Sequence, residues 1–445
     1  MKAITLNQLV HWLIRLGYTV LLCCLLPIIL LLFKKKLHHT HSHLEHRSFW
    51  ERFGKIDKSF KPGGIHIHCV SVGEINAAAG LIHALIEEYP HLSITLTTSS
   101  TTGAVHAYGL FKDTVQHCYL PVDIPIFINR FYRIIQPSLV LVTEVEIWPN
   151  MINICVKRNV PMVLINARMT AKSLKSYQHF RWIFRHSFRQ FTAICAQSTE
   201  SFDNFLAFGV YKNRLKLSRN MKFDLLPQDE DEILGRKLVA DYTLSGRRIL
   251  LAGSTHDPEE KILLTTYLTL KQKHPDLALI IVPRHPHRFD EVQQIINATG
   301  LANARVSETS RSVNIDIQGD EIDCLLVDKM GWLKACYSIC TLAFVGGSFV
   351  SKGGHNALEA ALYSKPIAMG PSIFNNPNIC QHLAAQNSLV ITQSEDELKE
   401  VFDHWLSNPD HAAKDGERGL KVLLRNAGSV EYTMGVLRKL LRGVN

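Results

Sequence analysis

The chain has 445 residues, 46% of them apolar and 20% charged, so it can bury about two domain cores. Lysine and arginine exceed the acids by nine, a balance that favours an anionic partner: nucleic acid, an anionic membrane surface or a phosphorylated substrate. The ten cysteines form no CxxC pair, which argues against a disulfide framework and favours reduced thiols in the cytosol.

The N-terminal segment predicts a membrane anchor. Residues 17–33, "GYTVLLCCLLPIILLLF", carry no charge and are followed directly by Lys34, Lys35 and Lys36. The run is slightly short for a span of roughly 20 residues, but the apolar residues before Arg15 extend it. A cleaved signal peptide is the alternative, although its positive charge belongs before the apolar core. We expect an uncleaved anchor over residues 1–36, with the rest of the chain on the cytoplasmic side.

A histidine-rich segment follows the anchor. Its imidazoles are candidate metal ligands: His38, His39, His41, His43 and His46. The alternative is a solvated segment at the headgroup surface, which we favour because no rigid ligand set is evident.

Beyond residue 60 the chain repeats an apolar β run, a polar turn and a helix. This alternation predicts parallel sheets with helices on both faces. The pattern lapses in the charged stretch near residues 225–245 and then restarts. We therefore predict an α/β protein with two Rossmann-like domains, residues 37–225 and 226–445, facing a central cleft. The last helix, residues 431–441, is expected either in the second domain or packed back on the first domain.

Loops at the carboxyl ends of parallel strands line ligand crevices, and those of the first domain present acids. Glu74 follows "HCVSVG", and Glu144 and Glu146 follow "LVLVT". Such a carboxylate is a candidate general base. The alternative is a first-turn glutamate that only complements the helix dipole.

The loops of the second domain suit a nucleotide. The turn "VGGSFVSKGGHNALEAALYSKP", residues 345–366, predicts a helix from near His355 whose free N–H groups attract phosphate, with Glu359 placed for ribose hydroxyls. The alternative to nucleotide binding is that the glycines only allow the backbone to turn and Glu359 only complements the helix dipole. "STHDPEE" offers a second helix N-terminus, and "VPRHP" places Arg284 and His285 after a strand. Without a P-loop or GxGxxG motif, P-loop kinases and typical dehydrogenases are disfavoured.

A basic aromatic helix is predicted over residues 173–190, "SLKSYQHFRWIFRHSFRQ". It suits either anionic headgroups and the phosphates of a lipid, or core packing with a solvated basic face. The anchor makes nucleic acid a poor partner. A nucleotide domain together with an acid-bearing domain indicates group transfer to a hydroxyl.

Seven motifs of the chain closely resemble those of the bacterial 3-deoxy-D-manno-octulosonic acid (Kdo) transferases. In chain order they are "SVGE", "TEVEIWPN", "KFD", "STHDPEE", "PRHP", "FVGGSF" and "GGHNALEAA". The resemblance spans nearly the whole chain. It implies the GT-B glycosyltransferase fold and transfer of Kdo from CMP-Kdo to the lipid A precursor (lipid IVA) in lipopolysaccharide inner-core synthesis. It also implies a location at the cytoplasmic face of the inner membrane.

The resemblance implies roles for single residues. Glu74 would deprotonate the acceptor, and Glu144 and Lys222 would stabilise the transition state. The implied CMP contacts are Arg284, His285, Met330, Gly331, Trp332, Asn356, Ala357, Leu358 and Glu359. We expect single-step inversion with no metal and no cofactor beyond the donor, because helix N-termini and Arg284 can stabilise the leaving CMP. A nucleotide-sugar epimerase of the same architecture is the alternative.

Overall fold

The computed structural model describes residues 6–37, 49–308 and 322–442, so the histidine-rich segment lies outside the described residues. The chain forms two compact units. The first unit comprises Met1–Asp224 and Asn426–Asn445, and the second comprises Leu225–Arg425. Each unit holds one seven-stranded sheet, and every strand pair in both sheets is parallel.

The sheet of the first unit has the order β3-β2-β1-β4-β5-β6-β7. Its strands are β1 (Ile65–His68), β2 (Ile94–Thr98), β3 (Gln116–Tyr119), β4 (Leu139–Thr143), β5 (Met162–Ala167), β6 (Ala193–Ala196) and β7 (Leu215–Leu217). The central strands are buried at every position, because helices cover both faces of the sheet.

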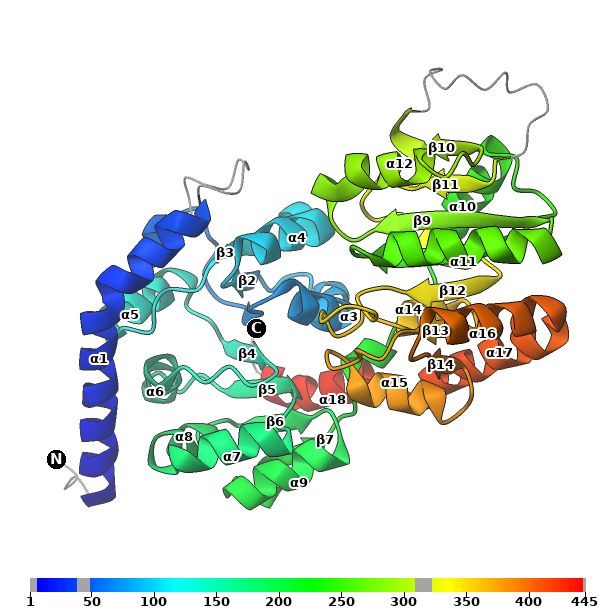
Figure 1. The fold of residues 1–445 in the computed structure, drawn as a ribbon. Coiled ribbons are helices and arrows are strands. Elements are labelled where there is room, and N and C mark those ends of the chain that lie inside the picture. Colours follow the sequence, from blue (N-terminus) through cyan, green and yellow to red (C-terminus); the bar gives the residue numbers. More distant parts are fainter. Residues whose placement is uncertain (1–5, 38–48, 309–321, 443–445) are drawn as a thin grey trace. The chain divides into compact units, whose positions relative to one another are not determined.

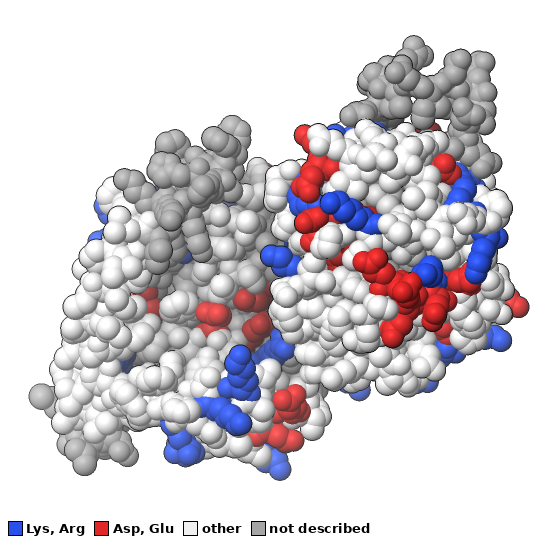
Figure 2. All heavy atoms as spheres, viewed as in Figure 1, with Lys and Arg blue, Asp and Glu red and all other residues white. Residues whose placement is uncertain are grey.

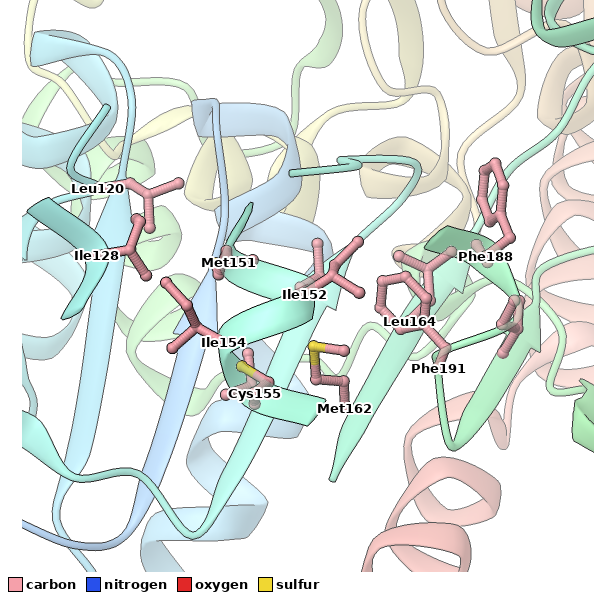
Figure 3. Packing of buried hydrophobic residues seen from close by; sticks show 14 of the residues in the cluster. Leu120, Ile128, Met151, Ile152, Ile154, Cys155, Met162, Leu164, Phe188 and Phe191 are labelled. Carbon is pink, nitrogen blue, oxygen red and sulfur yellow. The ribbon is translucent and has the colours of Figure 1, made fainter. Parts of the chain in front are cut away.

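The helices of the first unit pack on the sheet in two apolar clusters. They are α3 (Val72–Glu88), α4 (Thr101–Phe111), α5 (Pro125–Ile135), α6 (Pro149–Lys157), α7 (Ala171–His179), α8 (Arg181–Phe188), α9 (Thr199–Phe208) and α18 (Ser429–Leu441), with the 3-10 turns η1 (Lys112–Thr114), η2 (Lys212–Arg214) and η3 (Met221–Phe223). Figure 3 shows one cluster, in which Met151 and Ile152 of α6 lie near Leu164 of β5 and Phe188 of α8. The other cluster joins Leu81 of α3 to Leu437 of α18.

Helix α18 belongs to the first unit, which is one of the two placements that the sequence analysis left open for the last helix. The apolar face of α18, with Met434 and Leu437, completes the cluster over α3. An ion pair between Arg438 and Glu88, 2.8 Å apart, joins the same two helices. The chain therefore returns to its first unit after the second has closed.

The second unit repeats the architecture, with the strand order β10-β11-β9-β8-β12-β13-β14. Its strands are β8 (Arg248–Thr255), β9 (Leu277–Pro283), β10 (Asn303–Arg305), β11 (Cys324–Leu326), β12 (Leu342–Val345), β13 (Ile367–Met369) and β14 (Leu389–Ile391). Its helices are α10 (Asp229–Asp241), α11 (Glu259–Lys273), α12 (Phe289–Asn297), α13 (Leu333–Ile339), α14 (Leu358–Leu362), α15 (Pro377–Ala384), α16 (Glu395–Ser407) and α17 (Pro409–Asn426), with the 3-10 turns η4 (Pro286–Arg288) and η5 (Val306–Glu308).

The charged stretch predicted to join the domains contains α10, which packs on α13. Gly235 permits this packing, because a Cβ atom there would lie 2.8 Å from the carbonyl oxygen of Ala335. Four acids open α10 and complement its dipole, which explains the charge of the stretch. The weak periodicity arises because α10 buries few apolar side chains.

Helix α1 (Leu6–Leu37) packs against the first unit, beside α6 and α8, although the sequence suggested an anchor separate from the folded body (Figure 1). Arg15 Nη1 donates a hydrogen bond to Asn153 Oδ1 of α6, at 2.6 Å. Asn150 Nδ2 donates to Thr19 Oγ1 at 2.9 Å. Polar side chains within the apolar run account for this docking.

The two sheets share one topological feature that positions ligands. Strand order reverses between β1 and β4 in the first sheet and between β8 and β12 in the second. At such a point neighbouring connections leave the sheet in opposite directions and open a crevice at the carboxyl ends of the strands. Several candidate residues follow these strands: Glu74 follows β1, Glu144 follows β4, and the turn that leads to Glu359 follows β12.

Candidate active site

Glu74 lies beside the reversal point of the first sheet, in the first turn of α3. Its Oε2 accepts hydrogen bonds from the Val70 N–H, at 2.8 Å, and from Thr143 Oγ1, at 2.5 Å. Its Oε1 accepts from Ser71 Oγ at 3.2 Å. Only 8% of Glu74 is exposed, and burial raises its pKa against these hydrogen bonds. Oε1 keeps a lone pair for a further proton.

Thr143 lets Glu74 change its protonation state without stranding a partner. The Thr143 hydroxyl lies 2.5 Å from Glu74 Oε2 and also 2.9 Å from the carbonyl oxygen of His68. One hydroxyl hydrogen serves one acceptor at a time. It can therefore bond the carboxylate, and turn to His68 when Glu74 takes up a proton.

Glu144 and Lys222 lie near Glu74 in the same unit. Glu144 directly follows β4 with φ of +52°, a left-handed conformation that is rare for a residue with a side chain. Burial lowers the pKa of Lys222, while the charges of Glu144 and Glu74 oppose that shift. The structure thus brings together the three residues predicted as catalytic.

Glu146 joins these groups; the sequence analysis offered it as a candidate general base, but the family resemblance implied no role for it. Its pKa is raised to about 7, mainly by burial and further by the charges of Glu74 and Glu144. Burial thus raises the pKa of two glutamates of this region, Glu74 and Glu146, and favours their protonated forms.

Asp224, two residues after Lys222, holds that segment in place. Its Oδ1 accepts from the N–H groups of Gly428, at 2.7 Å, and Ser429, at 3.2 Å, and its Oδ2 accepts from the Val430 N–H. These groups open α18, so Asp224 fastens η3, with Lys222, to that helix. The sequence motif "KFD" contains Asp224, but its partner lies some 200 residues away.

In the second unit, the first half of the glycine-rich turn is occupied by Glu259 of α11. Glu259 Oε2 accepts from the N–H groups of His256, at 3.0 Å, and Gly347, at 2.8 Å, and Oε1 accepts from those of Ser348 and Phe349, both at 2.9 Å. Glu259 has no exposed surface. These donors in the first half of the turn are thus satisfied within the protein.

The second half of the turn also differs from the prediction. Helix α14 begins at Leu358 and has five residues, whereas the sequence suggested a helix from near His355. The Leu358 N–H donates to Asn356 Oδ1 at 3.2 Å, so this side chain caps the short helix. Positive φ angles at Gly353 and Gly354, +79° and +67°, need glycine, because Phe374 and Met369 fill the space of a Cβ atom.

Arg284 and His285 follow β9 and lie in a cluster of basic side chains. His256 Nε2 is 2.9 Å from His355 Nε2, and the rings are stacked. The ring centroids of His256 and His285 are 5.2 Å apart. Burial lowers the pKa of His256 to about 4 and that of His355 to about 3, and the Arg284 charge adds to both shifts. The sequence analysis named neither His256 nor His355 as a contact.

The remaining predicted contacts follow β11 and β12, and β11, β9, β8 and β12 are consecutive in the sheet. Met330 is 60% exposed, Gly331 has φ of +87°, and Trp332 lies 4.9 Å from Lys329 Nζ, measured to its ring centroid. Ala357 and Leu358 are buried. Burial raises the pKa of Glu359, against the charges of Lys334 and Arg284. Among the described residues, no group of three or more His, Cys, Asp or Glu is arranged to hold a metal.

The basic aromatic stretch 173–190 is not one helix but two, α7 and α8, which meet at Phe180. Phe188 is fully buried, as the core-packing reading expects. Phe180 and Trp182 are 54% and 56% exposed, as a surface-docking role expects. Each reading thus describes part of the stretch.

Comparisons with known proteins agree with the motifs. Residues 47–225 match the family model described as 3-deoxy-D-manno-octulosonic-acid transferase (kdotransferase). The 3-deoxy-D-manno-octulosonic acid transferase of Haemophilus influenzae is 37% identical over 383 residues, which cover 85% of this chain and 88% of that protein. That of Rickettsia prowazekii is 31% identical over 381 residues, covering 85% of this chain and 79% of the relative.

Among solved structures, UDP-GlcNAc 2-epimerase from Neisseria meningitidis aligns with a TM-score of 0.58. The alignment covers 85% of this chain and all of the epimerase at 13% identity, a likeness of fold alone. With two parallel seven-stranded sheets it confirms the predicted GT-B fold. The sequence identity to the transferases, over most of both lengths, shows that the chain belongs to the 3-deoxy-D-manno-octulosonic acid transferase family and is a glycosyltransferase.

Proposed function

We propose that the chain transfers Kdo from CMP-Kdo to the lipid A precursor, lipid IVA, in lipopolysaccharide synthesis. Family membership supports the transferred sugar, and the arrangement around Glu74 carries the proposal for mechanism. A buried carboxylate with a raised pKa, one open lone pair and a movable hydroxyl partner suits a general base.

In the proposed step, an acceptor hydroxyl oxygen attacks the anomeric carbon of Kdo as the bond from that carbon to the CMP phosphate oxygen breaks. The hydroxyl proton passes to Glu74 Oε1, and CMP leaves with the bonding electron pair. A single displacement inverts the anomeric configuration. Lys222, held near Glu144 and Glu74, offers positive charge to the reacting groups.

On the donor side, Arg284 and the neighbouring imidazoles of His256, His285 and His355 offer cationic and hydrogen-bonding groups to a nucleoside monophosphate. Glu359, near Arg284 and Lys334, is proposed to accept from ribose hydroxyls. The backbone at the exposed residues Met330 and Gly331 is proposed to contact the cytosine base of CMP. These groups supply the charge stabilisation for CMP departure, so we propose that no metal takes part.

The acceptor is an anionic lipid, and the chain carries one helix, among those described, that is long and apolar enough to cross a membrane, Leu9–Leu31. We propose that the protein is held at the cytoplasmic face of the inner membrane. The exposed Phe180, Arg181 and Trp182 at the start of α8 are proposed to meet anionic headgroups.

The test is transfer by the purified full chain in detergent, with CMP-Kdo as donor and lipid IVA as acceptor. We expect CMP release together with a lipid heavier by one or more Kdo residues, and an inverted anomeric configuration by NMR. The product mass also counts the sugars added. CMP release without a heavier lipid would refute the proposal that lipid IVA is the acceptor. Turnover of a UDP-sugar to its epimer would instead support an epimerase.

A further inference from the structure

One face of α1 is shielded along nearly its whole length. The half-buried residues recur with helical spacing: His11, Ile14, Arg15, Tyr18, Thr19, Leu22, Leu26, Ile29 and Leu30. From His11 to Leu30 this stripe runs for about 30 Å at 1.5 Å per residue. The helix therefore lies lengthwise against the first unit, beside α6 and α8 (Figure 1).

Polar contacts fix the first half of this stripe. Arg15 bonds to Asn153, and Thr19 bonds to Asn150, both on α6. Tyr18 hydrogen-bonds to Asp123, whose carboxylate accepts from the N–H groups of Asn150 and Met151 at the start of α6. The ring of His11 stacks on His186 of α8, with centroids 3.8 Å apart.

The opposite face of α1 is bare and apolar. Its exposed side chains are Leu9, Val10, Trp12, Leu13, Leu16, Val20, Leu21, Leu25, Ile28 and Leu31, each between 38% and 67% exposed. Figure 2 shows the surface over α1 as mostly white, with few charged side chains. The segment Leu9–Leu31 has a mean hydropathy of 2.3, and after two further apolar residues the sequence continues with Lys34, Lys35 and Lys36. An apolar face of this length, followed by lysines, suits an anionic lipid surface.

This packing is incompatible with a helix that crosses the bilayer. The hydrocarbon core is about 30 Å thick, so the docked stripe would fill it from end to end. The elements beside α1 would then enter the core as well. Lys157, one turn beyond Asn153 on α6, and Arg181, at the start of α8, are both exposed and would be immersed there.

We infer that α1 lies in the plane of the membrane surface, docked on the first unit, with its bare face in the acyl layer of one leaflet. Both ends of α1 then lie on the same side of the membrane. Trp182, one turn before His186 on α8, and Trp12, next to His11, supply aromatic side chains suited to the headgroup layer. The inference holds whichever sugar the enzyme transfers.

The first test is a cross-link in native membranes, in a Cys23→Ala/Cys24→Ala background of the full chain. Thr19→Cys with Asn150→Cys joins two positions whose short side chains already touch. Val20→Cys with Asn150→Cys is the matched control, because Val20 is 54% exposed on the bare face. After mild oxidation we expect the linked peptide pair by mass spectrometry for Thr19 and its loss for Val20. Equal linking of the two, or none, would overturn the docking.

The second test leaves the packed residues unchanged. Ala3→Cys in the same background is labelled with a membrane-impermeant maleimide, beside Tyr108→Cys, which is 54% exposed on α4. We expect both to react in inverted vesicles and neither in intact spheroplasts. Labelling of Ala3→Cys from outside the spheroplasts, with Tyr108→Cys protected, would show a crossing helix and overturn the inference.

A third variant asks what covers the bare face. Leu16→Cys, at a position 45% exposed, should resist the maleimide in inverted vesicles until detergent is added, and should form no dimer on oxidation. A disulfide-linked dimer would show that a second copy of the chain, not lipid, covers this face, and would overturn the membrane assignment.

Discussion

Glu74 and Glu259 occupy equivalent places in the two units, yet their surroundings differ. Each lies in the first turn of the helix that follows the first strand at the reversal point. Each also bonds across that point, Glu74 to the last residue of the neighbouring strand and Glu259 to the loop after it. Glu74 meets one N–H and two hydroxyls, whereas Glu259 meets four N–H groups. Burial raises the pKa of both.

The kind of donor separates a reactive carboxylate from a structural one. Hydroxyl groups can turn and become acceptors when a glutamate is protonated, but a backbone N–H cannot. Protonation of Glu259 would leave buried donors facing a hydrogen, while Glu74 can take up a proton at little cost. The same fold thus holds one glutamate whose surroundings allow it to accept a proton, as the proposed mechanism requires, and one that ties two loops together.

The largest effect is expected for Glu74→Gln. The amide keeps the size and can place its oxygen toward the Val70 N–H, but it cannot accept a proton. Transfer should fall by roughly 10²–10⁴-fold with unchanged CMP binding and thermal stability. Glu87→Gln, exposed on the same helix, is the matched control and should transfer normally. Near-normal turnover of Glu74→Gln would make Glu74 a helix-end residue.

Glu259→Gln should show the reverse pattern. Its amide nitrogen would face two of the four backbone N–H groups, and each buried unsatisfied donor costs about 1–3 kcal/mol. We expect the free energy of unfolding to fall by about 2–4 kcal/mol, measured as a lower denaturation midpoint with an unchanged slope. A variant with wild-type stability would contradict the structural role.

Arg284→Ala tests the donor side. Loss of a charge-assisted phosphate contact should raise the Kd for CMP by about 10–100-fold, measured by titration calorimetry, with little change for the lipid. Glu359→Ala should also weaken CMP binding. Arg236→Ala is the control, since its side chain is 70% exposed on α10. If the Arg284 and Glu359 variants bound CMP normally but lost lipid affinity, the proposed roles of the two units would be exchanged.

The smallest effect is a pair of opposite pH dependences. In the free protein His256 and His355 have pKa values of about 4 and about 3, and a bound anion should raise both. CMP affinity should therefore rise as pH falls, by at most about 10-fold per pH unit for each proton taken up. Transfer at saturating donor should instead rise with pH through the raised pKa of Glu74, because the base must be ionised.

A His256→Gln/His355→Gln variant separates the protein's share from the titration of CMP itself, which persists in the variant. Calorimetry in buffers of different ionisation enthalpy counts the protons taken up on binding. Equal proton uptake by the variant and the parent would exclude these imidazoles from donor binding.

The sequence by itself determined the alternation of strands and helices and the residues that follow the central strands. Runs such as "LVLVT" and "LALII" are apolar throughout because both faces of a parallel sheet are covered, and this local pattern predicts strands without knowledge of their neighbours. The acids after β1 and β4 and the cations after β9 could therefore be located from the local pattern alone. The apolar run of α1 could likewise be recognised from the sequence alone.

Only the tertiary structure decided which groups meet. Glu259 takes the N–H groups of a turn some 90 residues later, and His256 meets His355 across 99 positions. Thr19 of α1 finds Asn150, 131 residues away, which turns an apparent separate anchor into a docked helix. Local periodicity reports which face of an element is buried, but not against what, because partners from distant segments are chosen by the packing of the whole unit.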